Sequence, residues 1–173
     1  MAVFAVLMRL REICCDPRLI ADNWTGGSAK LDACIELVTS AVESGHRILL
    51  FSQFTSMLEL LAKRLDEAGV SHFTLQGSTP KPVRAEQVRR FNQGEADVFL
   101  ISLRAGGTGL NLTAADIVIH YDPWWNLAAQ NQATDRAYRI GQRNPVQVYR
   151  LIAQDTIEEK IVELQQAKQS LAD

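Results

Sequence analysis

Apolar side chains gather in five short runs along the chain, with polar or glycine-containing stretches between them. The runs cover residues 47–51, 71–75, 97–102, 116–121 and 146–152. Most of them are nearly continuous in Val, Ile, Leu and Phe, which is typical of strands that are covered on both faces of a sheet. The pattern therefore predicts five strands, most of them buried.

Segments with helical spacing separate these runs. Between residues 54 and 68, apolar side chains recur every three or four positions until Gly69 ends the pattern. Strands and helices that alternate about every 25 residues predict right-handed βαβ units, and hence an α/β fold with a parallel sheet and helices on both faces. The other expected helices cover residues 2–15, 30–42, 82–91, 126–138 and 155–171.

The loops that follow the predicted strands contain the most distinctive residues. Ligands of parallel α/β sheets bind at the carboxyl ends of the strands, where these loops lie. Three loops are the strongest candidates for binding: residues 52–54, 76–79 and 103–110.

Composition narrows the class of protein. The apolar runs are too short to span a bilayer, and no cleavage site of a secretory leader follows the first residues, so we expect an intracellular protein. Cys14 and Cys15 are adjacent and Cys34 stands alone, without a Cys-x-x-Cys spacing. This usage favours buried thiols over disulfides or a zinc site.

The loop at 104–111 carries Gly106, Gly107 and Gly109 directly after a predicted strand. Glycines there expose consecutive backbone N–H groups that bind phosphate oxygens; a turn without a ligand is the alternative. No Gly-Lys-Ser/Thr follows, and no Asp-Glu pair ends a strand to hold Mg²⁺, so the loop is not a Walker A motif. If the protein uses ATP, the cradle for its phosphates lies elsewhere.

Basic residues concentrate between residues 130 and 150, although the whole chain has a net charge of −2. Spacings of four and seven residues place Gln132, Arg136 and Arg139 on one helical face. Arginine forks pair with phosphate and stabilise charge on a transferred phosphoryl group. A solvated basic face, paired with Asp135 and nearby acids, is the alternative.

Three runs resemble motifs V, Va and VI of the Swi/Snf-type ATPases, in the second superfamily of helicases. They are GGTGLNL (106–112), YDPWWN (121–126) and QATDRAYRIGQ (132–142). Lys30-Leu31 and the stretches 48–54, 75–91 and 156–167 resemble further segments of the same lobe. The resemblance implies a RecA-like fold and the second, C-terminal motor lobe of an ATP-dependent double-stranded DNA translocase.

The resemblance also implies roles for single residues. Arg136 and Arg139 match catalytic arginines that reach ATP on the first lobe, whereas Gln132, Gly109 and Asn111 match positions near the nucleotide. Lys30 matches a lysine at the start of the lobe, to which we assign no role. Residues that match contacts to the phosphates of the tracked strand are Ser52, Gln53, Gly77, Ser78, Thr79, Ser102, Arg104, Gly106, Gly107 and Thr108.

The implied cofactors are ATP and Mg²⁺, bound mainly by a first lobe that this sequence lacks, so the isolated chain is expected to be inactive. The implied partners are that N-terminal RecA-like lobe and the double-stranded DNA backbone, with no membrane. We expect an approach helix and linker at 1–29, the lobe at 30–154 and a bracing helix at 155–173. The compact lobe favours a prokaryotic, cytoplasmic protein over a eukaryotic, nuclear one.

Some positions depart from the family pattern or need separate weighing. Tyr138 stands where the family has His, and Leu127 stands where it has Pro, which leaves details of the lobe interface open. Adjacent tryptophans cannot both face inward in an extended segment; we expect one in the core, and Trp125 either against nucleic acid or the partner lobe, or without such a contact. His120 ends an apolar strand and is expected to be a core histidine.

Two other functions remain alternatives at this point. An RNA helicase lobe has a related architecture, but the Arg-Ile-Gly-Gln run at 139–142 and the Asp-Pro-Trp-Trp run at 122–125 favour DNA. A non-catalytic docking module is a different class of protein. The intact face of Gln132, Arg136 and Arg139 argues against it.

Overall fold

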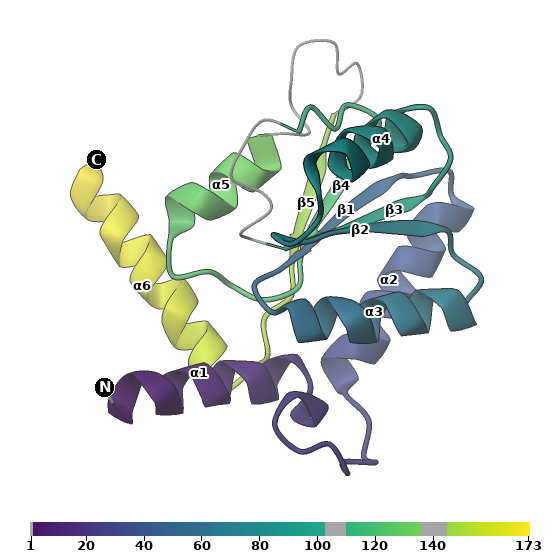
Figure 1. Cartoon of the computed structure of the whole chain (residues 1–173). Coiled ribbons are helices and arrows are strands. Elements are labelled where there is room, and N and C mark those ends of the chain that lie inside the picture. Colours follow the sequence, from purple (N-terminus) through teal and green to yellow (C-terminus); the bar gives the residue numbers. More distant parts are fainter. Residues whose placement is uncertain (1, 103–109, 136–144) are drawn as a thin grey trace.

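The chain folds around a single parallel sheet, in a computed structural model that describes residues 2–102, 110–135 and 145–173. Its five strands lie in the order β2-β3-β1-β4-β5 (Figure 1). They are β1 (Ile48–Ser52), β2 (His72–Leu75), β3 (Val98–Ser102), β4 (Ile117–His120) and β5 (Gln147–Arg150), and each pairs in parallel with its neighbours. The predicted α/β, RecA-like fold class is confirmed.

Helices cover both faces of this sheet because the central strands are apolar on both sides. Ile48 and Leu50 of β1 pack with α2 (Ala29–Glu43) and α3 (Thr55–Glu67). Leu49 and Phe51 point the other way, toward α4 (Lys81–Asn92) and α5 (Leu127–Asp135). Alternate residues of one strand thus build two separate cores, as the pleat of a strand requires.

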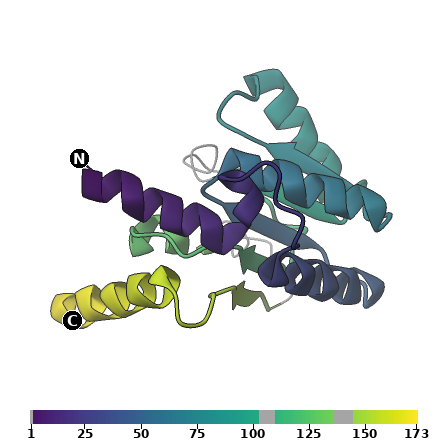
Figure 2. The same cartoon turned by 90° about the horizontal axis from the view of Figure 1, so that it is seen from below.

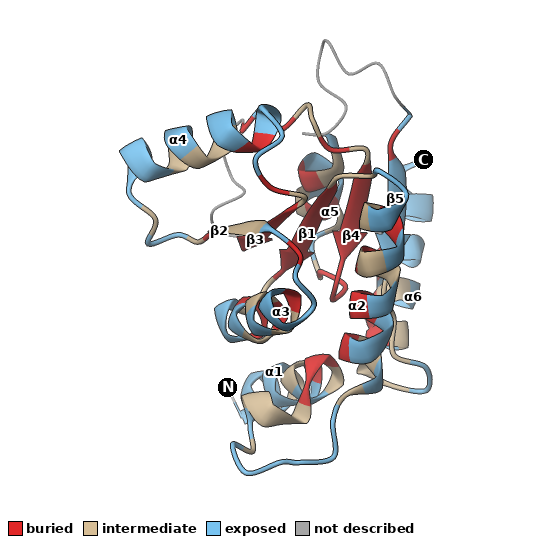
Figure 3. Cartoon of the chain, turned by 90° about the vertical axis from the view of Figure 1, so that its right-hand side faces the viewer, coloured by how far each residue is buried: buried red, intermediate tan, exposed pale blue. Residues whose placement is uncertain are grey.

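Burial follows position in the sheet (Figure 3). Every residue of β1, β3 and β4 is buried, whereas all four residues of β5 are exposed. β5 lies at an edge of the sheet, so the apolar run at 146–152 forms a strand that is not covered on both faces. The prediction of buried strands holds for the three central ones.

The two terminal helices lie side by side on one side of the molecule (Figure 2). They are α1 (Ala2–Cys15) and α6 (Ile157–Ala172), and a short 3-10 helix (Pro17–Leu19) follows α1. Arg11, Cys15 and Asp16 are buried, and the Tyr121 hydroxyl donates to the Cys15 carbonyl at 2.8 Å. Helix α1 therefore packs on the lobe; the division at residues 29 and 154 stays a prediction.

Side-chain caps fix where two of these helices begin. The Ser28 hydroxyl accepts from the Leu31 amide at the start of α2, and the Thr156 hydroxyl accepts from the Glu158 amide at the start of α6. Cys15 and Cys34 are buried free thiols, as predicted, while Cys14 is half-buried. Among the described residues, no helix combines the length and apolar character needed to cross a membrane.

Candidate functional site

A groove of about 780 Å³ opens at the carboxyl edge of β1, β2 and β3. The loops after β1 and β2, the last residue of β3, the first turn of α3 and one side of α1 line this groove. The structure thus brings together residues from two of the loops singled out by the sequence, 52–54 and 76–79, with Ser102 at the end of β3, while residues 103–109 of the third loop lie outside the described residues. The residues that line the groove are Met8, Glu12, Gln53, Phe54, Thr55, Ser56, Gln76, Gly77, Ser78 and Ser102.

The predicted phosphate-contacting residues differ in their exposure. Gly77 and Ser78 are exposed, and Gln53 and Thr79 are half-buried. The Thr79 hydroxyl accepts from the Gln76 amide at 3.0 Å, which fixes the turn after β2. Gln53, Gly77 and Ser78 line the groove, whereas Thr79 does not, and the contact of all four with nucleic acid stays a prediction.

Ser52 is placed differently from the expectation. Its side chain is fully buried, and its hydroxyl donates to Asp122 Oδ1 at 2.6 Å. The Gln53 amide donates to the other oxygen of Asp122 at 3.3 Å, and Gln53 Nε2 donates to the Pro123 carbonyl at 3.0 Å. Because its hydroxyl is engaged inside the protein, Ser52 fixes the loop after β1 to the loop after β4, and its contact with nucleic acid stays a prediction. Ser102 is also buried.

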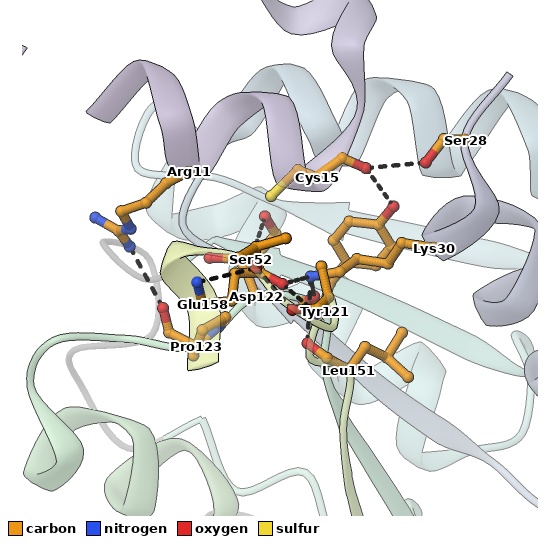
Figure 4. Close-up of polar contacts among 12 residues, drawn as sticks. Arg11, Cys15, Ser28, Lys30, Ser52, Tyr121, Asp122, Pro123, Leu151 and Glu158 are labelled. Atoms are coloured by element: carbon orange, nitrogen blue, oxygen red, sulfur yellow. Dashed lines mark hydrogen bonds and ion pairs between the residues drawn. The ribbon is translucent and has the colours of Figure 1, made fainter. Parts of the chain in front are cut away.

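Four ionisable side chains are buried behind this groove: Arg11, Lys30, Asp122 and Glu158 (Figure 4). They come from α1, α2, the loop after β4 and the first turn of α6. Burial raises the pKa of Asp122 to about 6, although the Ser52 hydrogen bond, Lys30 and Arg11 favour its charged form. Two cations and two carboxyl groups balance one another, which is how buried charges are tolerated in protein interiors.

Arg11 of α1 contacts both the loop after β1 and the loop after β4. Its Nη2 donates to the Pro123 carbonyl at 3.4 Å, and its guanidinium lies 5.6 Å from the centre of the Phe54 ring and 5.7 Å from that of Trp125. Burial lowers the pKa of this guanidinium, and nearby Asp122 partly opposes the shift. The sequence did not single out Arg11 and marked Asp122 only as part of the run 121–126, because nothing local reveals that residues more than a hundred positions apart lie close together.

Lys30 is the second cation of this cluster of buried ionisable side chains. Its ammonium donates to the carbonyl of Tyr121 at 2.9 Å, to the carbonyl of Leu151 at 3.2 Å and to Oε1 of Glu158. The same nitrogen is 5.2 Å from the centre of the Tyr121 ring. The sequence marked Lys30 through the resemblance alone, and the structure gives it specific partners.

The tryptophan pair divides as predicted. Trp124 is buried and meets Phe51 and His120 edge-on, with ring centres 6.1 and 5.5 Å apart. Trp125 is half-buried, with Arg11 over its ring. A contact between Trp125 and nucleic acid or another lobe stays a prediction.

His120 is the core histidine that its sequence context indicates. It is 1% exposed, and its Nε2 lies 3.1 Å from the Thr134 hydroxyl. Burial lowers its pKa to about 3, so the ring is neutral at pH 7. His120 therefore connects β4 to α5 through a hydrogen bond of its neutral ring.

Helix α5 carries the first residue of the predicted nucleotide-binding face. Gln130 and Ala133 are its buried residues, which leaves Gln132 exposed on the opposite side. Gln130 Oε1 accepts from the Trp124 amide at 3.3 Å and from Gln165 Nε2 at 3.2 Å, and these bonds fix how α5 is oriented.

Asn111, the other described position near the predicted nucleotide, is exposed and has φ of +53°. Its carbonyl accepts from Asn92 Nδ2 at 3.0 Å. Asparagine tolerates this left-handed conformation better than most residues. The predicted site residues that lie outside the described residues are Arg104, Gly106, Gly107, Thr108, Gly109, Arg136 and Arg139; Tyr138 lies there as well.

The fold defines a RecA-like α/β domain with a groove at the carboxyl ends of β1, β2 and β3. Residues 29–141 match the family described as the helicase conserved C-terminal domain, and the chain belongs to this family. The match spans the groove loops and the segment that contains Gln132 and both arginines.

Relatives in bacteria and animals are similar over almost the whole chain. A putative ATP-dependent helicase/translocase, YwqA, of Bacillus subtilis is 42% identical over 99% of this chain and 19% of its own length. An uncharacterized ATP-dependent helicase of Mycoplasma pneumoniae is 41% identical over 98% and 16%. The SWI/SNF-related matrix-associated actin-dependent regulator of chromatin subfamily A member 1 of Mus musculus is 39% identical over 97% and 17%. The chain thus spans less than a fifth of each of these relatives.

A solved structure agrees with the sequence comparisons. The crystal structure of the C-terminal part of the Fun30 ATPase domain matches with a TM-score of 0.76 and 33% identity, over 91% of this chain and 53% of that one. Together these similarities confirm the resemblance to the C-terminal lobe of the Swi/Snf-type helicase-like ATPases.

Proposed function

We propose that this chain is the second motor lobe of an ATP-dependent double-stranded DNA translocase of the Swi/Snf type. Membership of the helicase C-terminal family and similarity to proteins named as ATP-dependent helicases and chromatin regulators support this function. In such an enzyme, the phosphates of ATP and its Mg²⁺ are held mainly by the other lobe. This lobe contributes a grip on the DNA backbone and arginines that act across the interface.

The groove at the carboxyl edge of β1, β2 and β3 is the observation that carries the proposal. Its lining combines Gly77, Ser78 and the first turn of α3, whose N-cap residue Phe54 makes no side-chain cap, so that the N–H groups of Thr55 and Ser56 have no partner within the helix. Such a surface suits phosphate oxygens and carries no pattern for reading base edges. DNA binding is therefore expected to ignore base sequence and to weaken steeply with salt.

The residues of the predicted nucleotide-binding face are suited to ATP that is bound between two lobes. Gln132 is exposed on α5, and Arg136 and Arg139 follow it on the same helical face in the sequence. Bound ATP supplies the phosphoryl group whose transfer drives the motor. Arg136 and Arg139 stabilise the negative charge that develops during that transfer, a role that arginine fingers perform in related ATPases.

Substitutions at the predicted phosphate contacts test the DNA-binding half of the proposal. In the full-length protein, Gln53→Ala and Thr108→Ala are expected to lower DNA-stimulated ATP turnover several-fold while ATP affinity stays unchanged, because their partner is DNA. Gln93→Ala is the matched control, since Gln93 is exposed beyond the end of α4. A large loss of ATP affinity with unchanged DNA stimulation would place these loops on the wrong ligand.

Assays on the full-length protein also distinguish the DNA translocase from the two alternatives, an RNA helicase lobe and a non-catalytic docking module. Efficient strand displacement on an RNA duplex, with weak stimulation by DNA, would favour an RNA helicase lobe. A non-catalytic docking module would fail to restore ATPase activity when this chain is combined with the first lobe. We expect restoration, and no turnover by the isolated chain.

A further inference from the structure

The Lys30 ammonium occupies a place where two strands separate. Tyr121 directly follows β4 and Leu151 directly follows β5, and the last backbone hydrogen bond between these strands runs from the Leu151 amide to the His120 carbonyl at 3.0 Å. Beyond this point one segment turns toward α5 and the other toward α6. Lys30 bridges them through the carbonyls of Tyr121 and Leu151.

All the hydrogen-bonding capacity of this ammonium is used. It has three N–H donors, and the third donates to Oε1 of Glu158 in the first turn of α6. The side chains of Lys30 and Glu158 are 7% and 1% exposed, so water contributes little to holding the charges. Oε1 of Glu158 also accepts from the Ala153 amide at 2.8 Å, which ties the chain between β5 and α6 to the same point.

Helix α6 contacts the segment at 121–126 at a second point. Gln165 Nε2 donates to the Trp124 carbonyl and, at 3.2 Å, to Oε1 of Gln130 in α5. The segment is therefore held near its start by Lys30 with Glu158, and near its end by Gln165. Since α5 follows this segment directly, the position of α6 and the orientation of α5 depend on each other.

We propose that Lys30 is a positioning residue for the motor reaction. Together with Glu158 it fixes where the chain leaves β4, and so sets the direction in which α5 presents Gln132, the first residue of the predicted face to which Arg136 and Arg139 belong by sequence spacing. The proposal rests on the proposed function, because it concerns the geometry of the same arginine face. It assigns Lys30 no contact with ATP or DNA.

A double substitution separates positioning from stability. Lys30→Met alone leaves the Glu158 carboxylate buried without its cation, which destabilises a fold strongly. Lys30→Met with Glu158→Gln removes both charges, and the glutamine oxygen still accepts from the Ala153 amide. The double variant is therefore expected to regain most of the stability lost in Lys30→Met, while the carbonyls of Tyr121 and Leu151 still lack their donor.

The measurements are made on the full-length protein: the thermal unfolding midpoint, the KM for ATP and the DNA-stimulated kcat. For the double variant we expect a kcat lowered by roughly 10- to 100-fold, as for other displacements of catalytic groups by about 1 Å, with little change in KM. The matched control is Lys160→Met, which breaks the exposed pair with Glu163, 3.4 Å apart on the same helix, and is expected to leave all three quantities unchanged.

A double variant that folds and has the kcat of the wild type would overturn the proposal and leave Lys30 a structural residue. If the double variant does not fold, hydrogen exchange of Glu158→Gln decides, since the amide keeps the shape of the carboxylate while its grip on the ammonium weakens. Faster exchange at 121–135 with unchanged protection of β1 and β3 supports positioning. Unchanged exchange at 121–135 contradicts it.

Arg136→Ala in the same set of variants distinguishes this proposal from the proposed function. If the wild type shows no DNA-stimulated turnover, or if Arg136→Ala keeps it, the motor function fails and the role of Lys30 fails with it. If both behave as expected and the folded double variant turns over normally, only the positioning role of Lys30 is refuted.

Discussion

Asp122 is a carboxyl group without contact to solvent, and hydrogen bonds replace the water it has lost. Ser52 donates to one of its oxygens and the Gln53 amide to the other, while Arg11 and Lys30 lie close enough to favour the charged form. Losing one donor from such a buried group costs more than an average hydrogen bond, because the remaining partner stays desolvated. Ser52 therefore matters to this fold through Asp122.

Ser52→Ala is expected to lower the free energy of unfolding by about 1–3 kcal/mol, the range for a buried polar group left without its partner. Urea denaturation of the chain measures the change. Ser56→Ala is a suitable control because Ser56 is exposed on α3. Equal stability of Ser52→Ala and the wild type would mean that Asp122 does not depend on this bond.

His120 makes stability depend on pH in a defined direction. Its pKa falls from 6.5 to about 3 on folding, so the folded state disfavours the proton and the stability it contributes is lost as pH falls below about 6.5. From pH 7 to pH 5 this loss amounts to about 2 kcal/mol. Asp122 acts in the opposite direction, because its pKa is raised on folding to about 6 and acidification favours its folded form.

A comparison with His120→Gln isolates the histidine. The difference in unfolding free energy between the wild type and His120→Gln is expected to shrink by about 2 kcal/mol between pH 7 and pH 5, since only the wild type carries this group. Urea titrations at several pH values provide the measurement. A difference that stays constant with pH would show that His120 is not held neutral by burial.

Single residues were predictable from the sequence where their immediate surroundings decide their state. His120 ends an apolar strand, and one of two adjacent tryptophans must turn inward, so both were placed correctly. The state of Ser52 depends on Asp122, seventy positions away, and Lys30 depends on Glu158, 128 positions away. No local pattern contains such a pairing, so Ser52 was predicted only as a phosphate contact and Lys30 was left without a role.

At the scale of elements, the packing of α1 on the lobe is a relation that the sequence pattern did not reveal. The hydrophobic and polar pattern located the strands and helices to within a few residues, because periodicity is a property of the segment itself. It did not show that α1 packs on the lobe. That relation depends on distant contacts, such as the bond from the Tyr121 hydroxyl to the Cys15 carbonyl, 106 positions apart.

Removal of α1 tests whether it belongs to the lobe. A chain that begins at Ser28 loses the buried side chains of Arg11 and Cys15 and leaves the Tyr121 hydroxyl without its acceptor. We expect it to unfold at lower urea concentration than the whole chain, with increased exposure of apolar surface to a hydrophobic dye. An unchanged midpoint and unchanged dye binding would instead support an independent lobe that starts near residue 30.

At the scale of the whole molecule, the parallel sheet presents the loops after β1 and β2 and the end of β3 at one edge, and α5 packs on one of its faces. The DNA-binding groove and the nucleotide-binding face of the proposed motor thus share one rigid framework. The segment 121–126 connects them, and the buried charges of Arg11, Lys30, Asp122 and Glu158 hold that segment in place. We expect the coupling between ATP turnover and DNA binding to depend on the segment 121–126.

The most direct test of the account replaces the two arginines in the full-length protein and measures kcat and ATP affinity separately. Arg136→Lys and Arg139→Lys are each expected to lower kcat on the order of 10³-fold, because lysine lacks the planar fork that stabilises the transferred phosphoryl group. ATP affinity is expected to change far less, because the first lobe holds the nucleotide. Tyr138→His, outside the face of Gln132 and the arginines, serves as the control and should change kcat little. Near-normal kcat in both arginine variants would mean that this face is only a solvated surface, and would contradict the proposed motor function.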